Sequence, residues 1–393
     1  MTNIKMLFTK NNLPKFNTFE DFRSVAKKKL PKMVFDFVDG GADGEISLRA
    51  NRKAFENIQF DPHWLTDVSK RETNTVILGE SVSMPLLLAP CGLAGVVHKE
   101  GELAVARAAE RANTIFCIST GSCYSLEEIA AASRAKLWFQ LYLWKSEEVV
   151  KSLVQRAKDV DCKALVLTVD VPAVGKRERD YKNGMSLPPR IRLNNILDAS
   201  YRFRWLSHFM TGPEITFGNL RGVAEGDNAS AIGQYVDREL NDPSATWEKV
   251  DWIRKMWNGP LAIKGILSAR DAREAINRGV DAIYVSNHGG RQLDSVPGTA
   301  DVLSEVVDAV NGRAEILLDG GIRRGEDIAK ALALGADACL AGRPWYFGLA
   351  ADGERGVSRV LEILQTDLLR TMTLLGAPKI DDINSSLIRP RQH

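Results

Sequence analysis

Short apolar runs alternate with amphipathic stretches along the chain from residue 85 onwards. The eight apolar runs are Leu86–Pro90, Ile115–Ser119, Leu137–Tyr142, Ala164–Val169, Leu261–Lys264, Ala282–Ser286, Glu315–Asp319 and Ala338–Gly342. Stretches with helical periodicity lie between them, such as Glu100–Arg111, Ser146–Lys158, Ala269–Arg278 and Arg324–Leu334. Continuous apolar runs are typical of strands buried on both faces of a parallel sheet. Eight β–α units in this order predict an α/β fold, a closed (β/α)8 TIM barrel over residues 85–375, rather than an open doubly wound sheet.

Two regions interrupt this alternation. Residues 18–58 have helical patterns that break at Pro31 and at Gly40-Gly41, and we expect them to form a helical cap near the active face. A long segment separates the fourth strand from the fifth. Its last part, Thr246–Trp257, is expected to be the fourth barrel helix, whereas residues 176–245 mostly lack periodicity and are expected to form a long insertion loop. The whole chain, residues 1–393, is predicted to be a single domain.

Within the insertion, residues 201–210 interleave aromatic side chains with arginines, beginning Tyr201-Arg202-Phe203-Arg204-Trp205. One interpretation is a lid that packs its aromatic rings on the barrel. The alternative is a peripheral contact with a membrane surface. The pattern favours the lid, and the membrane contact stays open as the second interpretation.

Composition narrows the class of protein. The chain is 45% hydrophobic and 26% charged, as in ordinary soluble proteins, and its net charge of +2 does not favour nucleic acid as a partner. The five cysteines have no zinc-site spacing, so we expect no metal; Cys91, Cys117 and Cys339 are expected in the core, and this usage fits a reducing cytoplasm. Met1–Leu13 lacks the apolar region of a signal peptide, and no apolar run reaches about 18 residues, so we expect no transmembrane helix.

Polar residues at the ends of the strands are the candidates for chemistry, because active sites of these barrels lie at the C-terminal strand ends. His288 follows the sixth strand and precedes two glycines, which allow a tight turn and the close approach of a ligand. With Arg291 three residues further on, a base here is suited to remove a proton from an anionic substrate. Asp170 and Arg177 follow the fourth strand and are suited to hold a protonated His and a carboxylate, although a surface ion pair is equally consistent.

Lys264 ends the fifth strand after apolar residues, where a buried ammonium needs an anionic partner. A Schiff-base nucleophile, a phosphate ligand and a partner of a flavin ring all remain open for it. Glycine-rich turns follow the seventh and eighth strands, namely Asp319-Gly320-Gly321-Ile322-Arg323-Arg324-Gly325 and Ala341-Gly342-Arg343. Such turns, leading into helices at these two places, form the usual phosphate site of the fold.

Taken together, these motifs resemble the signature of the FMN-dependent 2-hydroxy-acid dehydrogenases and oxidases, which include enzymes of L-lactate, mandelate and glycolate. The resemblance runs from Leu30-Pro31-Lys32-Met33 to the C-terminal helix. It is carried by Phe139-Gln140-Leu141-Tyr142, Thr168-Val169-Asp170, Lys264-Gly265, Ser286–Asp294 and Leu318–Gly325. It implies FMN as cofactor and the oxidation of an L-2-hydroxy acid to the 2-oxo acid (EC 1.1).

The resemblance also implies a role for each matching position. His288 would take a proton from the substrate, Asp170 would stabilise the resulting imidazolium, and Tyr142 would hydrogen-bond near the oxygen on the reacting carbon. Arg177 and Arg291 would hold the substrate carboxylate. Lys264 would stabilise negative charge on the flavin. The phosphate of the flavin would be bound by Gly321, Arg323, Gly342 and Arg343. The full set implied for FMN is Gly92, Ser119, Gln140, Thr168, Lys264, Ser286, Asp319, Gly321, Arg323, Gly342 and Arg343.

The chain departs from the family pattern at two positions. Phe37 stands where the family usually places a Tyr that donates a hydrogen bond to the substrate carboxylate. The missing hydroxyl removes about 1 kcal/mol or somewhat more of carboxylate binding. Gly121 stands where the glycolate-oxidising enzyme has a bulky aromatic residue, and together with Gly92 it indicates room for a larger substrate. We therefore expect a bulky or aromatic 2-hydroxy acid, mandelate-like rather than glycolate-like.

Two further hypotheses compete with this one. A related FMN-dependent branch that acts on an amine or a peptide-derived group also lacks the N-terminal Tyr, but it has lost the Arg that this chain keeps as Arg291. A non-redox barrel would instead use Lys264 as a nucleophile. The electron acceptor is open between oxygen, a quinone and a cytochrome. The resemblance also implies a homo-oligomer, commonly a tetramer, and we expect a cytoplasmic protein, with residues 201–210 as the place of any peripheral contact with the inner face of the membrane.

Overall fold

The computed structural model of the protein describes residues 16–185, 190, 192–212, 214–223, 228–240 and 242–389. The expectation for Met1–Leu13 therefore lies outside the described residues, as do parts of the expected insertion at 176–245. None of the described helices is long and apolar enough to cross a membrane.

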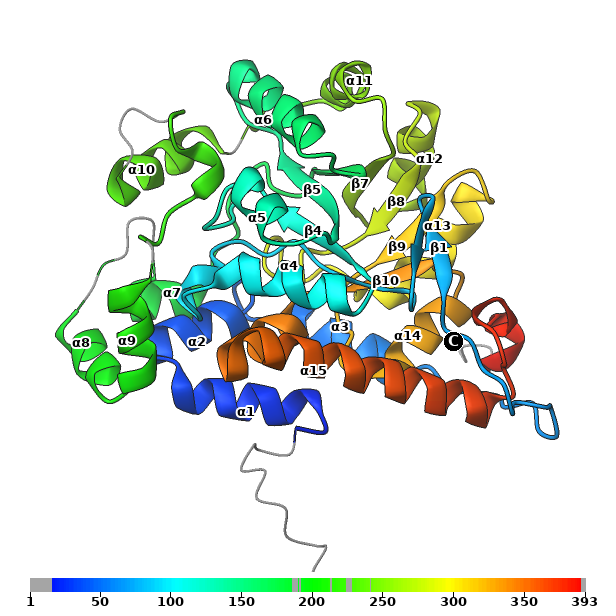
Figure 1. Ribbon diagram of the computed structural model, residues 1–393. Coiled ribbons are helices and arrows are strands. Elements are labelled where there is room, and N and C mark those ends of the chain that lie inside the picture. Colours follow the sequence, from blue (N-terminus) through cyan, green and yellow to red (C-terminus); the bar gives the residue numbers. More distant parts are fainter. Residues whose placement is uncertain are drawn as a thin grey trace, which may run out of the picture.

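Eight parallel strands close into a barrel, which confirms the predicted fold (Figure 1). Around the barrel the strands follow the order β10-β3-β4-β5-β6-β7-β8-β9, so each strand lies beside its neighbour in sequence and β10 closes onto β3. The strands are β3 Leu86–Leu88, β4 Ile115–Ser119, β5 Lys136–Tyr142, β6 Ala164–Thr168, β7 Leu261–Ile266, β8 Ala282–Val285, β9 Glu315–Leu318 and β10 Ala338–Ala341. Each coincides with a predicted apolar run to within a few residues at its ends.

Helices follow the strands and cover the outside of the barrel. They are α4 Gly101–Arg111, α5 Leu126–Ala132, α6 Glu147–Asp159, α11 Trp247–Met256, α12 Ala269–Asn277, α13 Thr299–Val310, α14 Gly325–Ala333 and α15 Arg343–Leu375. Several begin at a side-chain cap, as α5 does where Ser125 accepts a hydrogen bond from the backbone N–H of Glu128. The long α15 bends at Asp352 and Gly353, whose backbone angles are not helical.

Alternate strand residues fill the barrel interior, as the period of two in a strand requires. Leu87, Trp138 and Leu317 are buried there together with Ile77 and Val82 of a separate hairpin. This hairpin, β1 Thr75–Ile77 and β2 Glu80–Val82, closes the N-terminal end of the barrel, because the N–H of Leu78 donates to the carboxylate of Glu315 at the start of β9. The opposite, C-terminal end is left for the site.

All five cysteines are free. Cys117 and Cys339 are buried in strands, as expected. Cys91 is only partly buried, because it follows the end of β3 at the open face of the barrel, and it packs against the edge of the core.

The N-terminal cap consists of α1 Phe19–Lys29, α2 Lys32–Asp39 and α3 Ile46–Glu56, which agrees with the helical patterns and breaks in the sequence. Pro31 is the N-cap of α2, a position where its fixed φ suits the start of a helix. Figure 1 shows α1 and α2 lying alongside α15. The cap thereby reaches the C-terminal end of the barrel.

The insertion after β6 is more helical than the expected loop. It contains α7 Glu178–Asn183, α8 Leu193–Ser200, α9 Phe203–Thr211, the 3-10 turn η3 Gly218–Leu220 and α10 Ala229–Glu239. These pieces are short, and α8 and α9 bury no residue completely, so they leave little apolar periodicity in the sequence. Figure 1 shows α8 and α9 as a pair at one edge of the molecule.

Candidate active site

The register of the barrel brings four predicted site residues side by side at its C-terminal end. Ser119 pairs with Gln140 across β4 and β5, and Thr168 pairs with Lys264 across β6 and β7. Their side chains form a buried chain: Ser119 Oγ donates to Gln140 Oε1 at 3.2 Å, and Gln140 Nε2 donates to Thr168 Oγ1 at 2.9 Å. This row of donors and acceptors fixes one wall of the site.

His288 stands in a tight turn after β8. Its φ is +56°, and Gly289 and Gly290 follow with φ of +66° and +72°. A non-glycine residue in the left-handed region is uncommon and is often found at functional sites. The turn is pressed onto the cap, because a Cβ at Gly290 would lie 2.5 Å from the backbone N of Leu48. The backbone N–H of His288 donates to Ser286 Oγ at 3.0 Å, which fixes the start of the turn.

The structure brings His288 and Asp170 together, although they lie on different strands. His288 Nδ1 is 2.9 Å from Asp170 Oδ1. Burial lowers the pKa of His288, and Asp170 opposes that shift. Burial acts to raise the pKa of Asp170, but His288 and Lys264 lower it overall, so this carboxylate stays ionised. Gly265 makes room for the pair, since a Cβ there would lie 2.7 Å from Asp170 Cβ.

Tyr142 lies on the same side of the site as the His288–Asp170 pair. Its ring is nearly parallel to the imidazole of His288, with ring centroids 6.5 Å apart and an angle of 13° between the planes. Burial raises the pKa of its phenol, so Tyr142 remains a neutral hydrogen-bond donor at neutral pH. The three residues implied for catalysis thus gather at one place.

Two partly buried arginines at the site, Arg291 and Arg343, donate to backbone carbonyls rather than to carboxylates. Arg291 donates to the carbonyls of Phe37 and Gly40 at 2.7 and 2.8 Å, and Arg343 donates to Gly40 at 2.8 Å. Burial lowers the pKa of Arg291 to about 9, and the nearby positive charges of Arg177 and Arg343 add to the shift. Buried positive charges held only by carbonyls are an environment that favours a bound anion.

The ring of Phe37 lies at the centre of this cationic group. The guanidinium carbon of Arg291 is 5.2 Å from the ring centroid, and that of Arg177 is 5.8 Å from it. Arg177 is also engaged by Asp180, whose Oδ2 is 3.0 Å from Arg177 Nε. Arg177 is therefore at the predicted place, but it shares its charge with a buried carboxylate that the sequence did not single out.

A second buried group surrounds Asp319. Tyr284 donates its hydroxyl hydrogen to Asp319 Oδ2 at 2.9 Å, and Lys264 Nζ lies 3.8 Å from the same oxygen. Lys264 Nζ also donates to Ser286 Oγ at 3.0 Å. The other oxygen, Asp319 Oδ1, is buried and has no hydrogen-bond partner among the described residues. A buried acceptor without a partner is costly, so this atom is suited to receive a ligand hydroxyl.

The turns after β9 and β10 meet at the expected phosphate site. Gly321 has a φ of +107°, and a Cβ on it would lie 2.6 Å from the carbonyl O of Asn51. A Cβ at Gly342 would lie 3.0 Å from Cys91 Sγ, so both glycines permit close packing. Burial, with the charges of Arg343 and Arg52, lowers the pKa of Arg323 to about 9. Arg323 is further covered by the ring of Phe19, 4.1 Å from its guanidinium carbon.

Sequence reasoning missed the residues that attach the cap to the site. Asn51 in α3 is buried and exchanges two amide hydrogen bonds with Asn287, at 2.9 and 2.8 Å. Its Oδ1 also accepts the N–H of Thr299 at 3.2 Å, and Thr299 Oγ1 donates to the carbonyl of Asp319. These partners are more than 230 residues from Asn51, and no local pattern in the sequence indicates them.

The space expected beside Gly121 is filled by another residue. A Cβ at Gly121 would lie 3.1 Å from Cε1 of Phe217, a residue of the insertion. Gly92 faces Gly121 from the end of β3, since a Cβ at Gly92 would lie 2.8 Å from the carbonyl O of Gly121. The expectation of open room at Gly121 is thus incomplete, because an aromatic ring approaches it from a distant segment.

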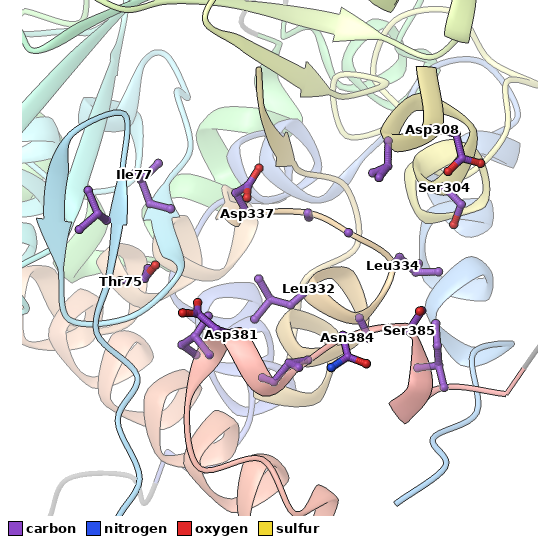
Figure 2. A pocket seen from close by; sticks show the side chains of 18 residues that line it. Thr75, Ile77, Ser304, Asp308, Leu332, Leu334, Asp337, Asp381, Asn384 and Ser385 are labelled. Carbon is purple, nitrogen blue, oxygen red and sulfur yellow. The ribbon is translucent and has the colours of Figure 1, made fainter. Parts of the chain in front are cut away.

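A cavity of about 600 Å³ lies at the other end of the barrel (Figure 2). It is bounded by the β1–β2 hairpin, helices α13 and α14 and the C-terminal segment, and its polar lining includes Asp308, Asp337 and Asp381. Asp337 directly precedes β10, which places the cavity at the N-terminal ends of the strands. It is therefore separate from the group around His288.

A closed parallel barrel with a histidine–aspartate pair, a cationic pocket and glycine-rich turns at its strand ends defines a (β/α)8 barrel enzyme that binds a phosphate-bearing ligand. Comparisons with known proteins identify the family to which this enzyme belongs. The profile of the FMN-dependent dehydrogenase family matches residues 26–390, and the chain belongs to that family. It is 43% identical over 376 residues to the L-lactate oxidase of Nostoc sp., covering 95% of this chain and 97% of the relative. It is 40% identical over 378 residues to human 2-hydroxyacid oxidase 1, covering 96% and 97%.

Two solved structures that resemble the chain also belong to enzymes of a 2-hydroxy acid, mandelate, as their names state. The chain is similar to a monotopic membrane protein, (S)-mandelate dehydrogenase, with a TM-score of 0.92 and 38% identity over 96% of this chain and all of that one. It is also similar to mandelate oxidase, with a TM-score of 0.82 and 39% identity over 95% of this chain and 98% of that one. The protein is therefore an FMN-dependent enzyme that oxidises L-2-hydroxy acids to 2-oxo acids. This excludes the non-redox barrel that would use Lys264 as a nucleophile.

The residues present fit FMN. Arg323 and Arg343, which donate to backbone carbonyls, are suited to its phosphate, and the unpartnered Oδ1 of Asp319 is suited to a hydroxyl of its ribityl chain. The buried row of Ser119, Gln140 and Thr168 supplies hydrogen-bonding groups at the height of the strand ends, where the flavin ring belongs.

Proposed function

We propose that the enzyme acts on L-2-hydroxy acids with a bulky apolar side chain, preferably an aromatic acid such as mandelate, and that His288 is the catalytic base. The observation that carries the proposal is the partly buried His288–Asp170 pair beside a cationic pocket that contains a phenylalanine. A base and an anion site must adjoin for a proton to be removed next to a carboxylate.

His288 takes the proton from the substrate at Nε2. Its Nδ1 is engaged by ionised Asp170, which keeps the proton of the neutral ring on Nδ1 and leaves Nε2 free to accept. The lowered pKa of His288 keeps the ring neutral, and therefore basic, at neutral pH. Asp170 then stabilises the imidazolium that results. FMN, when bound, accepts the two electrons released from the substrate carbon.

Arg291 and Arg177, both close to the ring of Phe37, bind the substrate carboxylate. Arg291 is already oriented by two carbonyls, so it loses little side-chain entropy when the substrate binds. Tyr142 donates to the oxygen on the reacting carbon, since its phenol stays protonated. The remaining implied residues hold the cofactor: Gly92, Ser119, Gln140, Thr168, Lys264, Ser286, Asp319, Gly321, Arg323, Gly342 and Arg343.

The preference for an aromatic acid is supported by what lines the pocket. Phe37 offers a ring without a hydroxyl close to both arginines, and Gly92 and Gly121 add no side chain of their own. Two structurally similar proteins are named mandelate dehydrogenase and mandelate oxidase. Retention of Arg291 supports a carboxylate substrate over an amine or a peptide-derived group.

Anaerobic mixing of the purified enzyme with (S)-mandelate, L-lactate, glycolate and the corresponding amines tests this proposal. We expect flavin absorbance to bleach fastest with mandelate and not at all with amines. Faster reduction by glycolate or L-lactate than by mandelate contradicts the preference. Reduction by an amine alone contradicts the substrate class.

We further propose that α8 and α9 contact the surface of an anionic membrane. Tyr201, Phe203 and Met210 are each more than 70% exposed, as is Leu193 in α8. Basic residues accompany this apolar surface, among them Arg204 in α9. A short amphipathic pair of this kind is suited to lie in the headgroup region without spanning the bilayer. Trp205 of the same segment instead packs inward, its Nε1–H donating to the carbonyl of Val96 at 2.7 Å, so the aromatic residues are divided between the lid interpretation and the membrane contact.

Co-sedimentation with phosphatidylglycerol vesicles tests the contact. The wild-type enzyme should bind, and the double variant Phe203→Ser, Met210→Ser should remain in the supernatant. Exposed Trp64→Ser, far from α9 in sequence, is the control and should bind like the wild type. Equal binding of all three proteins, or no binding of the wild type, contradicts the contact.

We also propose that the enzyme is a cytoplasmic homotetramer and that it passes its electrons to a membrane quinone. The quinone follows from the membrane contact, because a lipid-soluble acceptor reaches an enzyme at the bilayer surface. Stopped-flow reoxidation of the reduced enzyme by oxygen, by a soluble quinone and by cytochrome c compares the three acceptors. Reoxidation that is fastest with oxygen contradicts the quinone, and light scattering of the native mass tests the tetramer.

A further inference from the structure

The ring of Phe217 occupies the place that a side chain at position 121 would take. A Cβ built on Gly121 would lie 3.1 Å from Cε1 and 3.4 Å from Cδ1 of Phe217. The same Cβ would lie 3.6 Å from Ser119 Oγ, which belongs to the buried row at the strand ends. Phe217 is therefore in contact with the wall formed by β4, although it lies in the insertion after β6.

The segment after Phe217 is fixed to that wall by buried hydrogen bonds. Asn219 is fully buried; its Oδ1 accepts the N–H of Leu126 at 2.8 Å, and its Nδ2 donates to the carbonyl of Thr120 at 3.2 Å. The N–H of Gly218 donates to the carbonyl of Ser122 at 2.8 Å. A Cβ at Gly218 would lie 2.6 Å from the carbonyl O of Cys123, so this close approach requires glycine.

These contacts give the insertion a defined role at the site. The neighbouring helices α8 and α9 are exposed, whereas η3 is buried throughout and attached to the turn after β4. An attachment of this kind holds one aromatic ring at a fixed position beside Gly121. Gly92 also adjoins Gly121, since a Cβ on Gly92 would lie 2.8 Å from the carbonyl O of Gly121.

We propose that Phe217 is the residue that sets the upper size limit of the substrate side chain. Position 121, in the turn after β4, is glycine, and the ring of Phe217 from the insertion lies in the space that a side chain there would enter. This inference rests on the proposed function, since it concerns the pocket for the side chain of a 2-hydroxy acid. It makes the size limit depend on the position of η3, and the insertion thereby takes part in choosing the substrate.

The test compares a series of linear L-2-hydroxy acids of increasing chain length, together with (S)-mandelate, in the wild type and in Phe217→Ala. The anaerobic rate of flavin reduction gives kcat/KM for each acid. Phe217→Ala should shift the optimum to longer chains, with a gain of about ten-fold for each methylene group that the wild type excludes. Calorimetric titration with the 2-oxo acid products should show the same shift in Kd, independently of turnover.

A reciprocal variant separates a size limit from a general loss of structure. The double variant Gly121→Phe, Phe217→Ala returns the ring to β4 and should restore the wild-type profile, whereas Gly121→Phe alone places two rings in one space and should exclude mandelate. Phe203→Ala, an exposed aromatic residue of the same insertion, is the matched control and should leave the profile unchanged. Where Phe217→Ala loses FMN, Phe217→Leu gives the smaller shift in the same direction.

An unchanged chain-length profile in Phe217→Ala and Phe217→Leu, with normal flavin spectra, overturns the inference. That outcome leaves the proposed function standing, because the wild type would still reduce its flavin with hydroxy acids. The proposed function fails in a different way, when no 2-hydroxy acid reduces the wild-type enzyme.

Discussion

Restoring the missing hydroxyl with Phe37→Tyr should strengthen carboxylate binding. The centroid of the Phe37 ring lies 5.2 Å from the guanidinium carbon of Arg291 and 5.8 Å from that of Arg177. The side chain is only partly buried, so an added oxygen needs no rearrangement of the core. In the complex, a Tyr hydroxyl here is placed to donate to a carboxylate held by the same two arginines.

The size of the effect follows from the kind of hydrogen bond formed. A hydrogen bond to a charged group contributes about 1.5 to 3 kcal/mol, and the lower end applies because the hydroxyl also loses contact with water. A gain of about 1.5 kcal/mol corresponds to roughly ten-fold tighter binding. The maximal rate of reduction should change little, because the carboxylate is held in the same way before and during the reaction.

Anaerobic stopped-flow measurements separate the two quantities, since the substrate dependence of the reduction rate gives Kd and its plateau gives the rate constant. Mandelamide, which lacks the carboxylate charge, is the control ligand, and Phe203→Tyr on the exposed face of α9 is the control variant. The reasoning is refuted if Kd for mandelate stays within two-fold of the wild-type value, or if the amide gains as much as the acid.

Three further predictions follow from the site. The lowered pKa of His288 should place the acidic limb of kcat/KM below pH 6.5, with activity rising as the ring loses its proton. Asp170→Asn should move this limb to still lower pH and should lower kcat. An acidic limb above pH 6.5 in the pH-rate profile would count against His288 as the base. Asn51→Leu should lower the free energy of unfolding by about 2 kcal/mol in urea titrations, because buried hydrogen-bonding groups of Asn287 and Thr299 lose their partner. Asn57 is exposed, and the control variant Asn57→Leu should have little effect. Arg323→Met should weaken FMN binding by about thirty-fold in fluorescence titrations, as expected for the loss of about 2 kcal/mol. Arg324 is the exposed neighbour, and the variant Arg324→Met should bind FMN with normal affinity. Equal losses in both variants would contradict a place for Arg323 in the phosphate site.

The barrel was predictable because its strands are buried on both faces. Such strands are continuous apolar runs, and closure of eight of them places every C-terminal end at one face. Residues at strand ends, such as Thr168 and Lys264, therefore become neighbours through register alone. The glycines around His288 were informative for a similar reason, since positive φ is a property of the local backbone.

Contacts between distant segments were not predictable from the sequence. Asn51 and Asn287 meet across 236 residues, and each is an ordinary polar residue in its own segment. Phe217 lies in a stretch without periodicity, so nothing local indicated that it would fill the space beside Gly121. The engagement of Arg177 by Asp180 was equally hidden, because an arginine near an acidic residue is common on protein surfaces.

The difference between local patterns and distant contacts also explains why the helices of the insertion were not predicted. Its short helices α8 and α9 are fixed by few buried contacts, so their sequence resembles that of a loop rich in aromatic residues. The exposed apolar residues of α8 and α9 do not stabilise the core, and they indicate a binding partner instead. η3 is buried and tied to the barrel, and α9 is attached through Trp205, whose Nε1–H donates to the carbonyl of Val96; these contacts are with backbone atoms that no sequence pattern marks.

The most direct test of the central claim is anaerobic reduction of the flavin by (S)-mandelate in the wild-type enzyme and in His288→Gln. Gln keeps the size and polarity of the side chain but cannot serve as a base at neutral pH. We predict that both proteins bind FMN and that the variant is reduced slower by a factor of about 10³ or more. Reduction of His288→Gln at the wild-type rate would contradict the assignment of His288 as the base.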